Sequence, residues 1–127
     1  MKEQFVNYIL NLQDQITSTL EQLDGKASFQ EDNWKRPEGG GGRTRVIENG
    51  NIFEKGGVNT SQVHGELPEA MQKYFGVEDA NFFACGLSLV LHPKSPMVPT
   101  VHANWRYFEM YDKEGNIVDQ WFGGGQD

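Results

Sequence analysis

Two long β-favouring runs, separated by a short proline-rich segment, constrain the fold of this chain more than any other feature. The first run, NFFACGLSLVLHP, covers residues 81–93, and the second, PTVHANWRYFE, covers residues 99–109. Consecutive strands joined by a short connection usually pair side by side, and the side chains of each strand point to alternate faces. The two runs therefore predict an antiparallel strand pair.

This strand pair places polar side chains together on its faces. At the two-residue period of a strand, His102, Asn104 and Arg106 share one face of the second run, and Ser88 and His92 share one face of the first. Pairing brings His92 and His102 together near their common turn. The row from His102 to Arg106 spans about 13 Å, which suits a broad ligand with separated polar groups. The other face of the second run carries Ala103, Trp105, Tyr107 and Glu109.

Each end of this row has an evident chemical use. The planar guanidinium of Arg106 matches a carboxylate, and the imidazole of His102 exchanges protons near neutral pH. The alternative for Arg106 is a surface ion pair with Glu109 or Asp119, and a histidine in a strand is often structural. The sequence leaves both interpretations open.

The same residues do not complete a metal site by themselves. His92 and His102 supply two nitrogen ligands, whereas a catalytic metal usually needs three protein ligands, so His64, a carboxylate or a second chain is required. Nucleophilic catalysis has less support, because Ser88 and Cys85 have no base at a motif spacing.

The remaining elements complete an α+β pattern. Apolar residues at helical spacing predict an amphipathic helix over 5–23 that ends at Asp24-Gly25, and 67–76 reads as a short helix. Asn49-Gly50, between RVIE and NIFE, predicts a β-hairpin, and 117–122 predicts a further strand. We therefore expect one domain over 1–127, an antiparallel sheet flanked by helices, with a sheet edge left unpaired after the last strand.

Composition excludes several classes of protein. The net charge of −7 argues against non-specific binding of nucleic acid, which depends on many Lys and Arg contacts to phosphate. No apolar run approaches the ~20 residues of a membrane span, and the N-terminus lacks the apolar core of a signal peptide. The single cysteine, Cys85, forms no internal disulfide. We expect a cytoplasmic protein.

Residues 39–42 are four consecutive glycines, followed by Arg43 and Arg45. Such a run predicts a loop whose backbone approaches a ligand closely or moves as a lid, and the two arginines suit an anionic small molecule. The spacing does not match a phosphate-binding loop. A solvated basic loop is the alternative.

Three long motifs resemble one enzyme family. WKRPEGGGGRTRVIENGNIFEKGGVN (34–59), GLSLVLHPKSPMVPTVHANWRYFE (86–109) and WFGGGQD (121–127) look like the oxygen-dependent coproporphyrinogen-III oxidases of haem biosynthesis. The resemblance implies a flat antiparallel sheet with helices on both sides, in a homodimer. It implies conversion of two propionates of coproporphyrinogen III to the vinyl groups of protoporphyrinogen IX. Molecular oxygen is then the oxidant, with loss of carbon dioxide and no organic cofactor.

The resemblance also implies roles for individual residues. Ser88 is similar to a substrate-contacting serine, His102 to the proposed proton donor, and Asp127 to an aspartate that binds pyrrole N–H groups. Substrate binding is further implied for the tripeptide Asn104, Trp105 and Arg106. His92 and His102 match positions described as ligands of a divalent metal such as Mn²⁺ in some bacterial members. The basic Arg43 and Arg45 are expected to hold substrate acids beside the glycine lid.

Relatives of this kind continue well past the aspartate, so we expect residues 1–127 to be the N-terminal part of the oxidase catalytic domain, inactive or nearly so in isolation. Two alternatives remain open at the level of sequence. One is a tetrapyrrole- or anion-binding module without turnover. The other is a structural fragment in which the polar side chains of the row hydrogen-bond only to one another.

Overall fold

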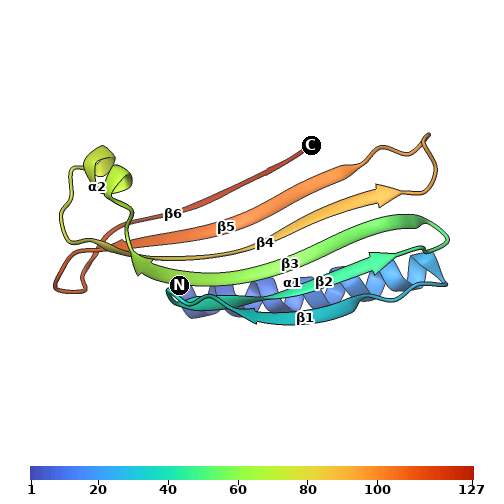
Figure 1. Cartoon of the computed structure of the whole chain (residues 1–127), viewed down its shortest axis with the longest axis horizontal. Coiled ribbons are helices and arrows are strands. Elements are labelled where there is room, and N and C mark those ends of the chain that lie inside the picture. Colours follow the sequence, from blue (N-terminus) through green and yellow to red (C-terminus); the bar gives the residue numbers. More distant parts are fainter.

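The computed structural model describes all 127 residues and consists of a single six-stranded sheet with two helices. Every strand pairs antiparallel with the next one in the chain, so the order across the sheet is β1 to β6 (Figure 1). The predicted antiparallel α+β architecture is confirmed. The elements are α1 (Lys2–Asp24), β1 (Gln30–Lys35), β2 (Gly40–Glu48), β3 (Phe53–Glu66), α2 (Glu69–Phe75), β4 (Asn81–Pro93), β5 (Val101–Tyr111) and β6 (Ile117–Gln126).

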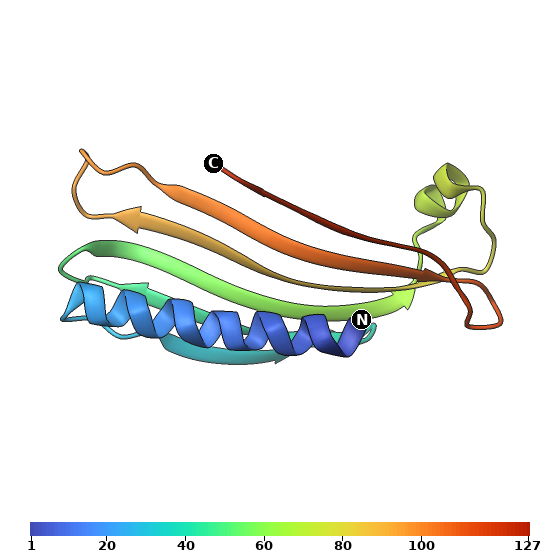
Figure 2. The same cartoon turned by 180° about the vertical axis from the view of Figure 1, so that it is seen from behind.

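Helix α1 lies along one face of the sheet, against β3 and β4 (Figure 2). Its Ile9 is fully buried, and Phe5, Leu12 and Ile16 pack around the same core. Burying such side chains contributes about 1.5–3 kcal/mol each, so this contact is the main hydrophobic core of the chain. The core consists of Ile9, Val58, Phe83, Cys85, Leu87, Leu89, Ala103 and Tyr107.

The last turn of α1 differs from the predicted apolar stripe. Leu23 is 59% exposed, whereas the adjacent Asp24 is buried. The carboxylate of Asp24 accepts hydrogen bonds from the backbone N–H groups of Asn51, Ile52 and Phe53 at 2.9–3.0 Å. A buried carboxylate needs such donors, and these three attach the end of the helix to the β2–β3 hairpin.

The hairpin predicted at Asn49-Gly50 is confirmed. Asn49 adopts a left-handed backbone conformation with φ 56°, and Gly50 donates its N–H to the carbonyl of Phe53 at 2.9 Å. Asparagine tolerates this conformation better than most residues, which is why the dipeptide signals a turn.

The predicted glycine lid is wrong. Gly40, Gly41 and Gly42 begin β2 and pair with β3, and the last two also pair with β1. A β-carbon at Gly42 would collide with the indole of Trp34, and one at Gly41 would collide with the carbonyl of Trp34. The glycines are therefore required for close packing of neighbouring strands and of an aromatic ring, and the run is held in the sheet.

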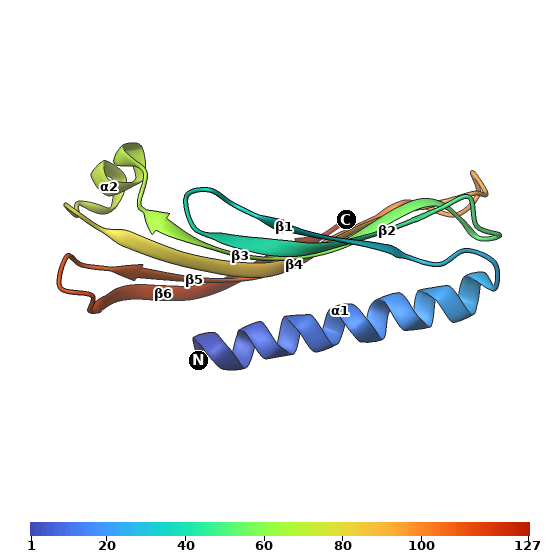
Figure 3. The same ribbon diagram turned by 60° about the horizontal axis from the view of Figure 1, so that its bottom comes forward.

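Helix α2 lies at one end of the sheet, on the side away from α1 (Figure 3). Its Met71 and Phe75 pack on a small second core formed by Leu67, Ala80 and Met110. No other helix lies on this face of the sheet, which is the face opposite α1. The middle of that face, between the small core and β1, is therefore open (Figure 3). Neither helix combines the length and the apolar content that a membrane span requires.

Candidate active site

A cavity of about 680 Å³ lies on the open face, opposite α1. Trp34 on β1 lines one side of it, and Phe108 and Trp121 line the other. The last two rings stack with their centroids 4.5 Å apart, and Phe75 of α2 contacts Trp121 with a centroid separation of 5.8 Å. The short helix α2 therefore supports one aromatic wall of the cavity.

Small residues form the floor between these aromatic walls. The strand register aligns Trp34, Gly42, Ser61, Gly86, Arg106 and Gly123 in one row across all six strands. From the β1 to the β5 position this row spans roughly 19 Å, because strands lie about 4.8 Å apart. A β-carbon at Gly123 would meet nothing within 4 Å, so no protein contact requires glycine there. The floor is broad and flat enough for a disc-shaped ligand.

The three polar residues of β5 lie on this open face, as the strand period predicts. His102, Asn104 and Arg106 stand directly opposite Val90, Ser88 and Gly86 of β4. Residues directly opposite each other on paired strands point to the same side of the sheet, so Ser88 shares the face with all three. Ser88 of β4 and Arg106 of β5 line the cavity. His102 lies further along β5, towards the β4–β5 turn.

Arg106 makes no ion pair with any carboxylate of the chain, unlike Arg36, Arg43 and Arg45. The expected alternative partner Glu109 lies on the α1 side and accepts hydrogen bonds from Tyr107 and Tyr111 instead. A β-carbon at Gly86 would lie 3.2 Å from Cγ of Arg106, so the arginine stem leans across this glycine over the cavity floor. The guanidinium is thus an unpaired cation beside the cavity.

The carboxylate of Glu109 is part of the scaffold. Burial acts to raise the pKa of Glu109, but hydrogen bonds from Tyr107 and Tyr111 more than offset this effect and leave the pKa below its usual value. Burial, followed by the adjacent carboxylate, raises the pKa of Tyr107 to about 12. Glu109 therefore stays ionised between the neutral phenols of Tyr107 and Tyr111, and it is not available to Arg106.

Two candidate catalytic residues meet at the end of β5. Nδ1 of His102 lies 3.3 Å from Oδ1 of Asp127, and both side chains are more than half exposed. The His92 ring lies nearby, with its centroid 6.4 Å from that of His102. An imidazole with a carboxylate on one nitrogen and solvent on the other can give or take a proton at Nε2.

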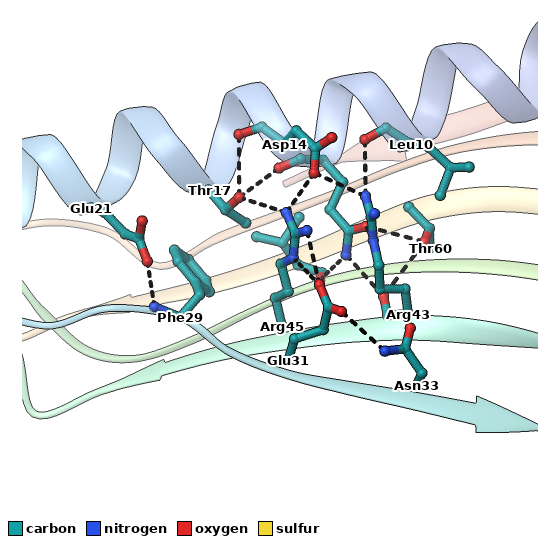
Figure 4. A network of polar contacts seen from close by, with 12 residues as sticks. Leu10, Asp14, Thr17, Glu21, Phe29, Glu31, Asn33, Arg43, Arg45 and Thr60 are labelled. Carbon is teal, nitrogen blue, oxygen red and sulfur yellow. Dashed lines mark hydrogen bonds and ion pairs between the residues drawn. The ribbon is translucent and has the colours of Figure 1, made fainter.

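Arg43 and Arg45 lie on the α1 side of the sheet, away from the cavity (Figure 4). Both guanidinium groups contact Asp14, at 3.1 Å and 2.8 Å, and Arg45 also pairs with Glu31 at 2.9 Å. The amide of Asn33, followed by Arg45, lowers the pKa of Glu31. The two arginines attach α1 to β1 and β2, and the structure does not bring them together with Ser88 and Arg106.

Trp105 is also separated from the other members of its predicted tripeptide. It stands opposite the buried Leu87, on the α1 side, and is 37% exposed. One strand cannot present three consecutive side chains to one face, so Trp105 does not share the surface of Asn104 and Arg106.

Comparison with known proteins identifies the lineage of this site. A sequence model described as coproporphyrinogen III oxidase matches residues 4–127. The chain belongs to the coproporphyrinogen III oxidase family. An oxygen-dependent coproporphyrinogen-III oxidase of Prochlorococcus marinus subsp. pastoris is 51% identical over 99% of this chain and 36% of the relative. That of strain NATL2A is 53% identical over 94% and 33%. The chain spans about a third of the length of the curated relatives that it matches.

The metal that some members of the coproporphyrinogen oxidase family are expected to bind does not fit these residues. No group of three His, Cys, Asp or Glu side chains in the chain is arranged to hold a metal ion. The Nδ1 atom of His102 already faces Asp127, and His92 has no third ligand beside it. These residues do not supply the three protein ligands that a catalytic metal usually needs.

Sequence reasoning missed two residues that line this cavity. Trp34 lines the cavity from β1, a strand so rich in polar residues that no period marks it. Asn59 lines the cavity from β3, and its Oδ1 is buried without a hydrogen-bond partner. The long β3 strand, which runs on from the predicted hairpin, was the available signal for Asn59.

Proposed function

We propose that the open face is the substrate platform of an oxygen-dependent coproporphyrinogen oxidase, which converts coproporphyrinogen III to protoporphyrinogen IX. The observation that carries this proposal is the unpaired guanidinium of Arg106 beside a broad cavity in a chain of this family. A fixed cation without a protein partner suits a ligand carboxylate, and the substrate carries four propionates.

The shape of the site supports a tetrapyrrole. A flexible disc lies on the glycine and serine floor between Trp34 on one side and the Phe108–Trp121 pair on the other. Aromatic walls and a flat floor bury the apolar ring surface, while the polar row of β5 meets its edge. Small ligands would leave most of this floor wet.

The chemistry assigns separate tasks to residues of β4 and β5 and to the residue that follows β6. Arg106 and Ser88 hold a propionate and fix the position of the ring, with Asn104 beside them. Asp127 accepts hydrogen bonds from pyrrole N–H groups and favours loss of a pyrrole proton, which makes the ring electron-rich. His102, beside Asp127, moves the proton.

The reaction balances without an organic cofactor. Each propionate becomes a vinyl group by losing carbon dioxide, two electrons and one proton. Two such steps release four electrons, which reduce one molecule of oxygen to two of water with uptake of four protons. Two of these protons come from the substrate, and solvent supplies the other two.

A cytoplasmic location is supported by the single cysteine, which is buried and unpaired. We also predict a homodimer. Residues 1–127 are predicted to be the N-terminal part of a larger catalytic domain.

A chimera tests the proposed activity. Residues 1–127 replace the matching segment of the 51% identical Prochlorococcus marinus relative, which supplies the remaining two thirds. The purified chimera is incubated with coproporphyrinogen III under air, and the product is oxidised and measured by protoporphyrin fluorescence. We expect oxygen-dependent product, and no decarboxylated product above a heat-inactivated control contradicts the proposal.

A further inference from the structure

Trp34 is the one apolar side chain of the edge strand β1, and it belongs to neither hydrophobic core. The other residues of this strand are all polar or charged. The side chain is 38% exposed and lines the cavity on the open face. Contacts other than the cores therefore hold its indole in place.

Two neighbours on β2 fix the indole over the sheet. Nε1 of Trp34 donates a hydrogen bond to Oγ1 of Thr44 at 3.1 Å. A β-carbon added to Gly42 would stand 2.3 Å from Cζ2 and 2.5 Å from Cε2 of the indole, so the ring covers this glycine. Gly42 is directly opposite Trp34 in the strand register, and Thr44 is two residues further along the same face. The indole therefore leans from β1 across β2, with its N–H end held by a hydroxyl.

Arg106 leans towards Trp34 from the opposite side of the cavity. Its stem crosses from β5 over Gly86 of β4, as the indole crosses from β1 over Gly42 of β2. Only the position of Ser61 on β3 separates the two glycines in this row. Gly42 and Gly86 are therefore roughly 10 Å apart, because strands lie about 4.8 Å apart. A single ligand of tetrapyrrole size can meet the guanidinium at one end of this gap and the indole at the other.

The geometry points to Trp34 as a further substrate-binding residue, whose indole stacks on a pyrrole ring of the ligand that Arg106 holds by a propionate. Thr44 is the positioning residue of that indole. This inference rests on the proposed function. Aromatic rings attract one another beyond the effect of area burial alone. A ring whose N–H is already bonded to the protein also loses little freedom when the ligand binds, and such preorganisation increases affinity.

A purely structural role for Trp34 is the alternative. An aromatic side chain opposite a glycine on a neighbouring strand covers the backbone there and stabilises the pairing of an edge strand. That role predicts a lower melting temperature when the indole is removed, with no change in ligand affinity. A binding titration therefore separates the two roles.

A double-mutant cycle tests the ring contact and its positioning together. Trp34→Phe keeps an aromatic ring without the N–H, Thr44→Val removes the hydroxyl at similar size, and a third variant combines the two changes. Trp34→Ala removes the ring. Tyr8→Ala removes a 55% exposed ring from α1, on the other side of the sheet, and is the control. Binding of coproporphyrin III, the stable oxidised tetracarboxylate, is titrated by absorbance with the 127-residue chain, and melting is followed by circular dichroism.

We expect Trp34→Ala to weaken coproporphyrin binding at least about tenfold and Trp34→Phe to weaken it about threefold, because stacking area is lost. Thr44→Val weakens binding about 2- to 5-fold when Trp34 is present, since the indole is then less firmly held. The same change has no further effect in Trp34→Phe, because no N–H remains to be positioned. Tyr8→Ala binds coproporphyrin as the wild type does.

Wild-type affinity in Trp34→Ala overturns the ring contact, whatever its melting temperature. Trp34→Phe, which keeps a ring over Gly42, gives the same test if Trp34→Ala does not fold. An equal loss from Thr44→Val with and without the indole means that the hydroxyl contacts the ligand directly, and this result overturns the positioning role.

The chimera distinguishes this inference from the proposed function. Normal turnover with unchanged coproporphyrin affinity in the Trp34 variants overturns the role of Trp34 alone. Weakened binding in these variants, with a chimera that forms no product, supports the ring contact and overturns the oxidase. A wild-type chain that binds no coproporphyrin overturns both.

Discussion

Nδ1 of His102 lies 3.3 Å from Oδ1 of Asp127, at the point where β5 and the end of the chain exchange two backbone hydrogen bonds. Both of those bonds, from His102 N–H to the Asp127 carbonyl and back, are 2.9 Å long. The backbone thus fixes the separation of two side chains that come from distant parts of the sequence. A carboxylate here orients the imidazole and leaves Nε2 free for proton transfer.

Replacing His102 is expected to separate catalysis from binding. In the chimera, His102→Ala lowers turnover by about 100-fold or more, because positioned proton transfer typically contributes that much, while coproporphyrin binding changes only a few-fold. His92→Ala is the matched control on the neighbouring strand and retains most of the activity. An equal loss in both variants contradicts this assignment and places His92 in the machinery. The readout is product fluorescence against time at saturating substrate.

Arg106 is expected to dominate affinity for the carboxylates. Arg106→Ala weakens coproporphyrin binding by about 10- to 100-fold, because a charge-assisted hydrogen bond is stronger than a neutral one. Arg106→Lys recovers part of the loss, since a lysine keeps the charge but not the planar fork. Lys113→Ala removes one positive charge from an exposed turn and has no effect. Equal affinities across all three variants in an absorbance titration would show that Arg106 does not bind the ligand.

Gly123 is expected to matter for the ligand and not for the fold. A methyl group at this position meets no protein atom, so Gly123→Ala melts at the wild-type temperature or slightly above it. The larger Gly123→Leu places its side chain over the cavity floor and weakens coproporphyrin binding at least about tenfold. Gly57→Ala, on the same face but outside the cavity, is the control. Tight binding in Gly123→Leu would mean that the ligand does not cover β6.

Arg45 is expected to stabilise the chain without contributing to binding. Its side chain is only 17% exposed and contacts Asp14, Glu31 and Thr17, so Arg45→Met removes hydrogen bonds between charged groups. We expect the free energy of unfolding to fall by about 1.5–3 kcal/mol in urea titrations. Lys73→Ala, which breaks an exposed pair with Glu69, costs less than about 0.5 kcal/mol. A folded Arg45→Met variant that loses coproporphyrin binding would return Arg45 to the site.

Asp24 is expected to make the free energy of unfolding depend on pH in the acidic range. The N–H groups of Phe53 and Ala27, followed by those of Ile52 and Asn51, hold the pKa of Asp24 well below its usual range. A carboxyl group whose pKa is lowered by folding stabilises the native state when the pH lies above its pKa in the unfolded chain, which is about 4. This stabilisation is lost progressively as the pH falls below that value. The urea midpoint of Asp24→Asn therefore lies below that of wild type at pH 6. The difference between the two urea midpoints narrows towards pH 2. A difference between the two midpoints that is constant between these pH values contradicts the assignment. Asp32→Asn removes an exposed carboxylate of β1 and is the control.

Local sequence signals predicted those elements in which periodicity and turn chemistry agree. The β4–β5 pair follows from alternation around a short proline-rich connection, and the hairpin at Asn49 follows from the tolerance of asparagine for a left-handed conformation. The row of His102, Asn104 and Arg106 on one face follows from the strand period alone. The family follows from the three motifs.

Features that depend on partners distant in the sequence left no local signal. The glycine run looked like a mobile loop, because nothing local shows that Trp34 packs its indole on Gly42. Arg43 and Arg45 looked available to a ligand, because their acidic partner Asp14 lies about thirty residues earlier, on a helix. Strand β1 has no apolar period, since it is an exposed edge.

The order of residues by itself determined the family, the antiparallel sheet and which side chains of β5 share a face, because these depend on motifs and on a two-residue backbone period. Only the tertiary structure decided which arginine is free. Pairing of charges is a matter of distance in space, and the docking of α1 neutralises Arg43 and Arg45 on one side of the sheet while Arg106 is left without a carboxylate on the other.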